Sequence, residues 1–280
     1  MSTGCKLTVT IACLFVVTHV VTGGSPAVAR AVAASSAGGS TEWLTVQSGR
    51  LKAQVYASPQ ARTRPVLVIV LHGDAPFNKP DYQYRFAQRA AASGNVLAAA
   101  ILRPGYTDPS GDTSSGVRGL TTGDNYTSAR IAMIATAIRE LAQQYHARAT
   151  VLVGHSGGAA IAADILALRP RLAGRALLVS CPCDVPQWRS YMKTAYPTPL
   201  WDKPVRSLSP LALASRVPAK DRVVMMVGTK DRVAPATFTQ AYARALLRRG
   251  VDVNVVQLPG KGHEILLEPA VLSELEALLR

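Results

Sequence analysis

A Gly-His-Ser-Gly-Gly segment at residues 154–158 constrains the fold of this chain more than any other stretch. It follows an apolar run at 149–153 and precedes an alanine-rich apolar run at 159–168. The first run predicts a buried strand and the second a helix, which gives the Gly-x-Ser-x-Gly pattern a strand–turn–helix context. The pattern alone also occurs in Gly- and Ser-rich loops. In this context we predict that Ser156 projects from a sharp turn at the carboxyl edge of a sheet.

The periodicity of the apolar residues predicts strands and helices in alternation. The predicted strands are 42–47, 51–57, 66–71, 96–102, 149–153, 176–180, 222–227 and 251–258, and the predicted helices are 81–92, 126–145, 157–168, 235–249 and 269–280. Continuous apolar strands separated by helices favour an α/β fold, with a mostly parallel sheet covered on both faces. Residues 181–209 interrupt this rhythm with many prolines and several aromatic side chains, and we interpret them as a small lid.

The N-terminal residues have the pattern of a targeting segment. Lys6 precedes an apolar run at 7–21, and small-x-small sites follow around residues 27–33. We predict a secretory signal peptide over 1–31, with cleavage after residue 29, 31 or 33 left open. An uncleaved anchor is the alternative, although the run is short for a membrane span of about 20 residues.

Beyond this segment we predict a flexible lead-in at 32–41 and one domain over 42–280. The expected location is secreted or periplasmic, with no stable membrane span after cleavage.

The chain carries a formal net charge of +14. Its arginines are scattered along the sequence, and no basic stripe with interleaved aromatic residues accompanies them. Nucleic acid is therefore not an expected partner. A solvated basic surface is the preferred interpretation, with loose attraction to an anionic cell envelope as a further consequence. The oligomeric state stays open.

Two cysteines, Cys181 and Cys183, flank Pro182 in the predicted domain. We favour two packed thiols and leave open a disulfide, which would close a very small ring. Two thiols are too few for a zinc site, and no other metal-ligand cluster is evident. No phosphate-binding or dinucleotide-binding glycine motif follows the first buried strand. The sequence therefore predicts neither a cofactor nor a metal.

Candidate partners for Ser156 lie at the ends of two later strands. A serine hydroxyl needs an adjacent base and a third group that orients the base. His263, the last histidine of the chain, follows the strand 251–258, and Asp231 follows the strand 222–227. Both positions are at the carboxyl edge to which Ser156 points. The competing aspartates are Asp184, Asp202, Asp221 and Asp252, which lie in the lid, before a strand or at the start of one.

The remaining requirement is a pair of backbone N–H groups that stabilise a developing oxyanion. We predict one from Gly157, directly after the serine, and the other from Asp74, with Ala75 as the next choice. His72 is expected to brace this loop, and His155 to point away from a substrate.

Four segments together resemble the α/β-hydrolase superfamily: Leu71-His72-Gly73, residues 154–158, Gly228-Thr229-Lys230-Asp231 and Gly260-Lys261-Gly262-His263-Glu264. The similarity is greatest to prolyl-oligopeptidase catalytic domains and to dienelactone hydrolases. It implies an eight-stranded sheet and a Ser156–Asp231–His263 triad that cleaves esters or amides. Tyr82 and Tyr84 lie near the loop where the peptidases use a tyrosine in the oxyanion hole.

Of the activities that this resemblance implies, we expect hydrolysis of a small carboxylic ester, with the N-terminal segment exporting the enzyme. A serine peptidase or amidase acting on short peptides is the alternative. A non-catalytic ligand-binding protein that retains the fold is the alternative of another class.

Overall fold

The computed structural model describes Met1 and residues 39–58 and 61–280. Its strands are β1 (Ser40–Val46), β2 (Gly49–Ala57), β3 (Val66–Leu71), β4 (Val96–Ile101), β5 (Ala149–His155), β6 (Arg175–Val179), β7 (Arg222–Gly228) and β8 (Asp252–Leu258). Its helices are α2 (Tyr82–Ala90), α3 (Ser128–Gln144), α4 (Gly157–Leu168), α5 (Val185–Ala195), α6 (Pro210–Leu213), α7 (Ala236–Leu247) and α8 (Pro269–Leu279), with 3-10 turns η1 (Pro199–Asp202) and η2 (Ala214–Arg216). The predicted strands and helices are confirmed within a few residues, whereas α5, α6 and the 3-10 turns, which lie in or near the predicted lid at 181–209, are additions.

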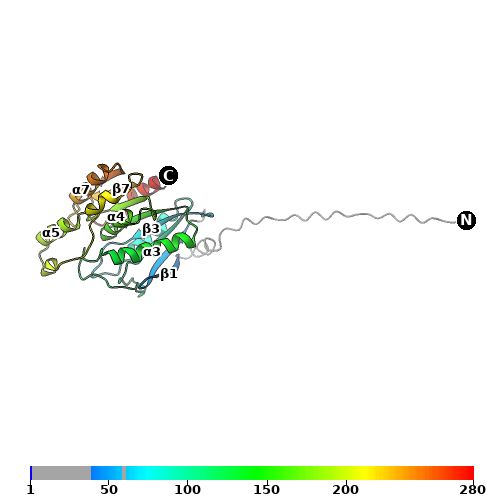
Figure 1. Cartoon of the computed structure of the whole chain (residues 1–280), viewed down its shortest axis with the longest axis horizontal. Helices are drawn as coiled ribbons and strands as arrows, with labels where there is room; N and C mark the ends of the chain where they lie inside the picture. Colours follow the sequence, from blue (N-terminus) through cyan, green and yellow to red (C-terminus); the bar gives the residue numbers. More distant parts are fainter. Residues whose placement is uncertain (2–38, 59–60) are drawn as a thin grey trace.

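The eight strands form one sheet in the order β1-β2-β4-β3-β5-β6-β7-β8 (Figure 1). β1 and β2 make an antiparallel hairpin, β2 lies antiparallel to β4, and every later pair of neighbours is parallel. The predicted α/β fold with a mostly parallel sheet is therefore confirmed. The carboxyl ends of β3, β5, β6, β7 and β8 share one edge, because these strands run in the same direction.

Only some of the predicted segments fall within the described residues. The predicted signal peptide at 1–31, apart from Met1, and most of the lead-in at 32–41 lie outside the described residues. β1 begins at Ser40 and pairs with β2, so the last two residues of the predicted lead-in belong to the sheet.

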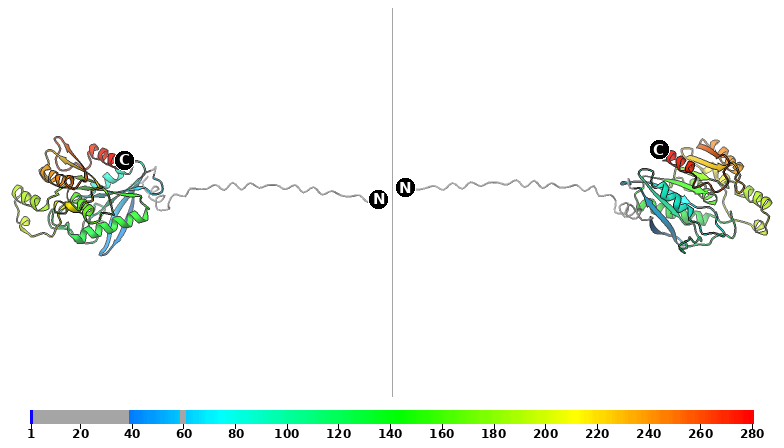
Figure 2. Two further views of the ribbon diagram at one scale, coloured as in Figure 1. Left: turned by 45° about the horizontal axis from the view of Figure 1, so that its top comes forward. Right: turned by 180° about the vertical axis from the view of Figure 1, so that it is seen from behind.

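Helices cover both faces of the sheet, as Figures 1 and 2 show. On one face, side chains such as Ile69, Leu152 and Met225 pack with α3, α4 and α7. On the other face, neighbouring residues in the strands, such as Val68 and Val153, pack with α2 and α8. Successive side chains of a strand point to opposite faces. A strand covered on both faces therefore needs an unbroken apolar run, and all six residues of β3 are buried.

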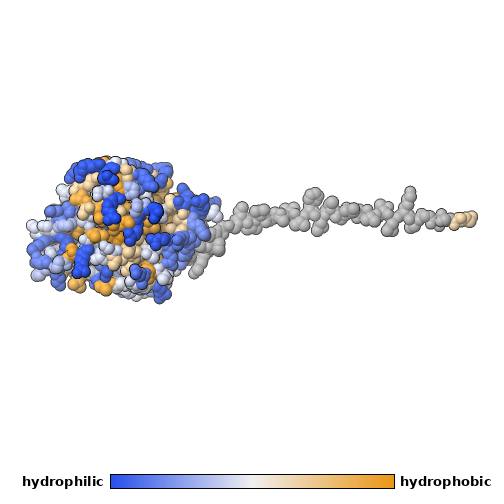
Figure 3. All heavy atoms as spheres, in the orientation of Figure 1, coloured by the Kyte–Doolittle hydropathy of each residue, from blue (hydrophilic) through white to orange (hydrophobic). Residues whose placement is uncertain are grey.

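The surface is more polar than these layers. In Figure 3, hydrophilic residues form most of the margin of the visible face, and hydrophobic residues gather nearer its middle. Within the described ranges, no helix has both the length and the apolar character that a membrane crossing requires.

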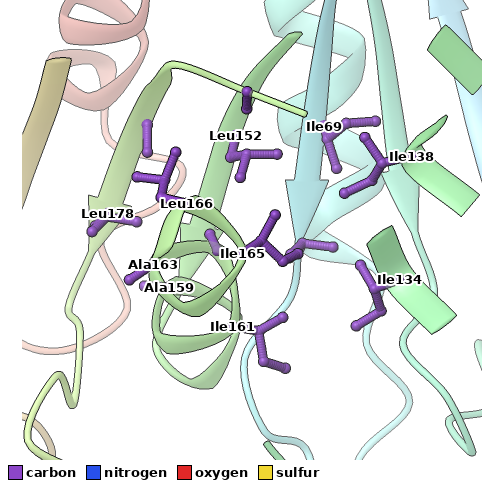
Figure 4. Close-up of a cluster of buried hydrophobic side chains, with 14 of the residues drawn as sticks. Ile69, Ile134, Ile138, Leu152, Ala159, Ile161, Ala163, Ile165, Leu166 and Leu178 are labelled. Carbon is purple, nitrogen blue, oxygen red and sulfur yellow. The ribbon is translucent and has the colours of Figure 1, made fainter. Parts of the chain in front are cut away.

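The helix α4 lies in the middle of the larger core. Eleven of its residues are buried, from Gly157 to Ala167. Figure 4 shows Ile161 and Ile165 of this helix between Ile69 and Leu152 of the sheet and Ile134 and Ile138 of α3. A helix that is apolar on every side is expected only in such a buried position. Burial of each large aliphatic side chain contributes about 1.5–3 kcal/mol, so α4 is held firmly against the sheet.

Two buried carboxylates have no hydrogen-bond partner among the described residues: Asp164 on α4 and Asp221 just before β7. Burial raises the pKa of Asp164 well above its usual value, because the charged form loses its hydration there. Burial also raises the pKa of Asp221, to about 6, although the nearby Lys220 acts in the opposite direction. Asp221 is therefore ionised above pH 6 at a cost to folding stability.

We predict that Asp221→Asn stabilises the protein in a pH-dependent way. Above pH 6 the carboxylate is charged in both the folded and the unfolded states, and the cost of its burial is complete. Between about pH 6 and pH 4 the folded wild type takes up a proton that the unfolded chain lacks, so the wild type gains stability as the pH falls. Thermal unfolding should show the variant melting a few degrees higher at pH 7.5 and nearly level with wild type at pH 4.

The matched control is Asp252→Asn, because Asp252 is exposed and forms a surface ion pair with Arg222. Its removal should change the melting temperature little at either pH. The prediction is contradicted if Asp221→Asn does not raise the melting temperature at pH 7.5. It is also contradicted if the rise is the same at pH 7.5 and at pH 4.

Candidate active site

Ser156 lies at the turn between β5 and α4, with backbone angles φ 52° and ψ −122°. A positive φ is uncommon for a residue with a side chain and costs of order 1–3 kcal/mol. The N–H of Ser156 donates to the carbonyl of Val179 at the end of β6, at 2.8 Å. The surrounding core thus holds a strained conformation that lifts Ser156 away from the sheet at its carboxyl edge.

The glycines around Ser156 allow a very close approach of backbone segments. A Cβ atom on Gly158 would collide with the carbonyl oxygens of Leu71 and His72 at the end of β3. A Cβ atom on Gly154 would collide with the backbone of Gly158 and Ala159. The predicted need for small residues is therefore met by direct backbone contact between the end of β3, the end of β5 and the first turn of α4.

Asp231 and His263 meet at the same edge. The Nδ1 atom of His263 lies 3.0 and 2.9 Å from the two carboxylate oxygens of Asp231, whose side chain is 0% exposed. The N–H groups of Val233 and Ala234 donate to Oδ1 of the same carboxylate at 2.9 and 2.8 Å. Burial acts to raise the pKa of Asp231, but the imidazole of His263 and these two N–H groups lower it more. Asp231 is therefore an ionised acceptor that orients the ring of His263.

A chain of hydrogen bonds holds the backbone of His263 against His155, the residue directly before Ser156. Nε2 of His155 donates to the carbonyl oxygen of His263 at 3.1 Å, and the hydroxyl of Ser180 donates to the same oxygen at 2.9 Å. On the other side of the ring, Nδ1 of His155 accepts from the hydroxyl of Tyr82 at 2.9 Å. That hydroxyl accepts from the N–H of Gly73 at 2.5 Å.

These bonds fix the state of His155. A carbonyl can only accept, so Nε2 carries the proton and Nδ1 is the acceptor. Burial, with the nearby His263, lowers the pKa of His155 to about 3, so its ring stays neutral. His155 is buried and supports the loop of His263, a role that the sequence did not predict.

The structure therefore joins Asp231 and His263 directly and ties the backbone of His263 to His155, the residue directly before Ser156. The hydroxyl of Ser156 makes no hydrogen bond with the described residues, and the remaining nitrogen of His263, Nε2, makes none either. Hydrogen bonds between such groups are often long without substrate and tighten when substrate binds.

The competing aspartates have other partners or positions. Asp184 caps the N-terminus of α5, Asp202 forms an ion pair with Lys193, and Asp252 forms one with Arg222. Asp221 is buried beside the start of β7, at the opposite edge of the sheet from Ser156.

The loop after β3 brings Asp74 close to Gly157. A Cβ atom on Gly157 would collide with the hydroxyl of Tyr126 and with Oδ1 of Asp74. The backbone N–H of Asp74 makes no hydrogen bond with the described residues. It is therefore available to donate to a bound group.

The side chain of Asp74 belongs to a buried ion pair that the sequence did not predict. Its carboxylate lies 2.9 Å from the guanidinium of Arg103 and accepts from Tyr126 at 2.5 Å and from the N–H of Gly123 at 2.8 Å. Arg103 also donates to the carbonyl of His72, and its backbone N–H donates to the ring of His72. His72 therefore braces this loop, as expected. The only sequence signal for the pair was a charged residue within the first three residues after each of two buried strands.

Tyr82 and Tyr84 do not serve the oxyanion-hole role that the family resemblance suggested for a tyrosine near this loop. Tyr82 is bound to Gly73 and His155, and Tyr84 donates to Asp108 at 3.0 Å. Asp108 in turn pairs with the buried Lys52 at 2.6 Å. Neither hydroxyl is therefore free to point at an oxyanion.

The predicted lid segment packs over the loop that carries Asp231. The indole of Trp188 on α5 donates to the carbonyl of Val233 at 2.7 Å, and the hydroxyl of Tyr191 donates to that of Arg232 at 2.7 Å. Trp188 also packs against Gly123, where a Cβ atom would collide with its ring. The segment thus contacts the loop that carries Asp231 and the turn at Gly123.

Cys181 and Cys183 at the start of this segment form a disulfide, whereas the sequence favoured packed thiols. The turn that begins at Ser180 (φ 51°) brings their Cα atoms to 5.1 Å, which is within the usual range for a disulfide.

Three side chains at this edge, those of His155, His263 and Glu264, lie close enough together to be considered as metal ligands. Both nitrogens of His155 and Nδ1 of His263 already have hydrogen-bond partners, and the Glu264 side chain is exposed. The donors left for a metal are one imidazole nitrogen and one mobile carboxylate, which do not fit a structural or catalytic metal site.

Comparison with known proteins gives a consistent result. The sequence model of the alpha/beta hydrolase family matches residues 68–216, more than half of the chain. No curated protein sequence matched significantly.

Three similar solved structures are peptidases and an esterase. A puromycin-hydrolyzing peptidase of Mycobacterium tuberculosis has a TM-score of 0.66 at 17% identity, over 86% of this chain and 38% of that one. An acylaminoacyl peptidase of Pyrococcus horikoshii has a TM-score of 0.63 at 14% identity, over 85% of this chain and 39% of the peptidase. An esterase of Pyrococcus furiosus has a TM-score of 0.63 at 15% identity, over 86% of this chain and 91% of the esterase. At these identities the likeness establishes the fold, and the chain spans about two fifths of the length of the two peptidases.

We predict that Gly158→Ala destabilises the protein severely, by at least about 3 kcal/mol, because the added methyl group meets backbone atoms that have no room to move. Denaturant unfolding of the purified variant, or its soluble yield, measures this. Gly262→Ala is the matched control, since a Cβ atom there meets nothing within 4 Å and its φ is not positive. The free energy of unfolding of Gly262→Ala should stay within about 0.5 kcal/mol of the wild-type value. Equal stability of the two variants would show that α4 does not approach the end of β3 as closely as described.

Proposed function

Since this chain belongs to the α/β-hydrolase family, we propose that it is an exported serine hydrolase that cleaves carboxylic esters through an acyl-enzyme intermediate. The observation that carries the proposal is the Asp231–His263 pair, held beside the strained turn of Ser156 at one edge of the sheet. A nucleophile, a base and an orienting carboxylate at three strand ends are the parts that acyl transfer needs.

In the proposed reaction the hydroxyl of Ser156 attacks the carbonyl carbon of the ester, and Nε2 of His263 takes its proton. Asp231 remains ionised and stabilises the imidazolium that forms. The N–H groups of Gly157 and Asp74 donate to the oxyanion of the tetrahedral intermediate. His263 then gives the proton to the leaving alcohol, and water hydrolyses the acyl-enzyme with His263 again as the base. No metal or cofactor takes part in these steps.

The environment of Asp74 bears on the oxyanion. A carboxylate near a developing negative charge would oppose catalysis, but Arg103 pairs with it and Tyr126 and Gly123 donate to it. The paired carboxylate positions the loop, while the backbone N–H of Asp74 is the group that would donate.

Export is part of the proposal and rests on the predicted signal peptide at 1–31. The Cys181–Cys183 disulfide supports it, because disulfides persist mainly in oxidising compartments such as the periplasm or the extracellular space.

We predict that a fluorophosphonate probe labels the wild type and does not label Ser156→Ala, because only an activated serine reacts with it. Intact-protein mass spectrometry or in-gel fluorescence measures the labelling. Ser273→Ala is the matched control; its exposed hydroxyl on α8 donates to the carbonyl of Pro269 and contacts none of the candidate residues, so labelling should persist. Equal labelling of wild type and Ser156→Ala would disprove the nucleophile, and a ligand-binding protein without catalysis would not label at all.

We predict that kcat/KM is higher for p-nitrophenyl acetate than for an aminoacyl p-nitroanilide. An alcohol leaving group needs less acid assistance than an amine, and this chain covers 91% of the length of the Pyrococcus furiosus esterase. Release of p-nitrophenol or p-nitroaniline measures the two reactions directly. A preference for the anilide would favour the peptidase or amidase alternative, which the names of the two peptidase structures suggest.

A further inference from the structure

A cavity of about 580 Å³ lies beside the candidate site and is separate from it. Its walls come from residues 117–127 on one side and from 200–206 on the other, with Arg130 and Arg189 between them. Ser156, Asp231 and His263 do not line it. Its volume is in the range of pockets that hold small molecules.

The charges around this cavity are strongly unequal. Five cationic side chains line it, and Asp124 is the one carboxylate among the lining residues: the cations are Arg118, Arg130, Arg189, Lys203 and Arg206. Asp124 accepts from the N–H of Thr121 at 2.8 Å within its own turn, so it faces a partner already. A cavity with this composition attracts anions.

Two of the cations hold the walls together. Arg189, which is mostly buried, donates to the carbonyl oxygens of Thr122, Trp201 and Lys203, and so joins the two sides of the cavity. Arg130 donates twice to the carbonyl of Val117. The walls are therefore fixed by hydrogen bonds to backbone groups.

The other three cations, Arg118, Lys203 and Arg206, are exposed, and their side chains have no partner among the described residues. They extend from both walls. Three unpaired cations at one opening leave donors available for an anionic group, and the forked guanidinium of arginine suits a carboxylate.

The same cavity exposes large apolar side chains. Val117 and Leu120 are each 68% exposed, and Leu200 is 36% exposed. They are three of the few large hydrophobic residues of the described chain that face solvent. Apolar side chains next to unpaired cations match a ligand with an anionic end and a hydrocarbon part.

We propose that this cavity binds a monomeric alkyl carboxylate. Arg118, Lys203 and Arg206 hold the carboxylate, and the alkyl chain covers Val117, Leu120 and Leu200. The cavity shares the turn at 121–124 with the loop of Asp74, because the N–H of Gly123 donates to that carboxylate. Binding nevertheless uses none of the residues assigned to hydrolysis, so the proposal stands independently of the proposed function.

Isothermal titration of the purified protein with decanoate tests this proposal, with acetate and 1-decanol as probes of the charge and the chain alone. We expect saturable binding of decanoate, at least about tenfold tighter than that of either comparison ligand. The double variant Arg118→Gln/Arg206→Gln should weaken decanoate binding at least about tenfold. Arg248→Gln/Arg249→Gln is the matched control, since it removes the same charge from exposed positions outside the cavity and should leave the affinity unchanged.

Ser156→Ala should bind decanoate like the wild type, which separates this site from the proposed hydrolytic one. Thermal unfolding of each variant confirms that the exposed substitutions leave the fold intact. The proposal is overturned by absent or non-saturable decanoate binding, by equal affinity of the two double-arginine variants, or by 1-decanol binding as tightly as decanoate. Loss of binding in Ser156→Ala would place decanoate at the nucleophile and would also overturn it.

Discussion

The contact between the first turn of α4 and the ends of β3 and β5 is the constraint on which the rest of this structure depends. At Gly158 there is no space for a side chain, because the carbonyl oxygens of Leu71 and His72 occupy it. This approach is sustained by an α4 that is buried on every side. It pushes Ser156 into a left-handed conformation, which neighbouring core residues must stabilise against a cost of order 1–3 kcal/mol. Ser156, the loop after β3 and the start of α4 are thereby fixed relative to one another.

A second feature connects the loops of that edge. The hydrogen bonds run from Gly73 to Tyr82, from Tyr82 to His155 and from His155 to the carbonyl of His263. One buried, neutral ring thus links the loop after β3 to the loop after β8, and it belongs to the residue directly before Ser156. The Asp74–Arg103 ion pair does the same for the loops after β3 and β4. Removal of one member of such a buried pair leaves an uncompensated charge, so these loops are held in place strongly.

Much of this arrangement could be predicted from local sequence patterns. The apolar run at 66–71 and the alternation of strands with helices indicated the parallel sheet, because a strand covered on both faces has few polar residues. The glycines at 154–158 indicated the turn of Ser156, and Asp231 and His263 were singled out because they follow predicted strands. The carboxyl ends of parallel strands share an edge, so chain order alone brought these three residues to one side.

The sequence by itself thus determined which segments form strands and helices, the sharp turn at Ser156 and the edge at which Asp231 and His263 lie, because these depend on local periodicity and on the direction of parallel strands. Only the tertiary structure decided that Arg103 pairs with Asp74, that Tyr82 supports His155, that Cys181 bonds to Cys183, and that basic residues of two distant loops enclose one cavity. Such pairings depend on the relative positions of loops far apart in the chain, and no local pattern of residues records those positions.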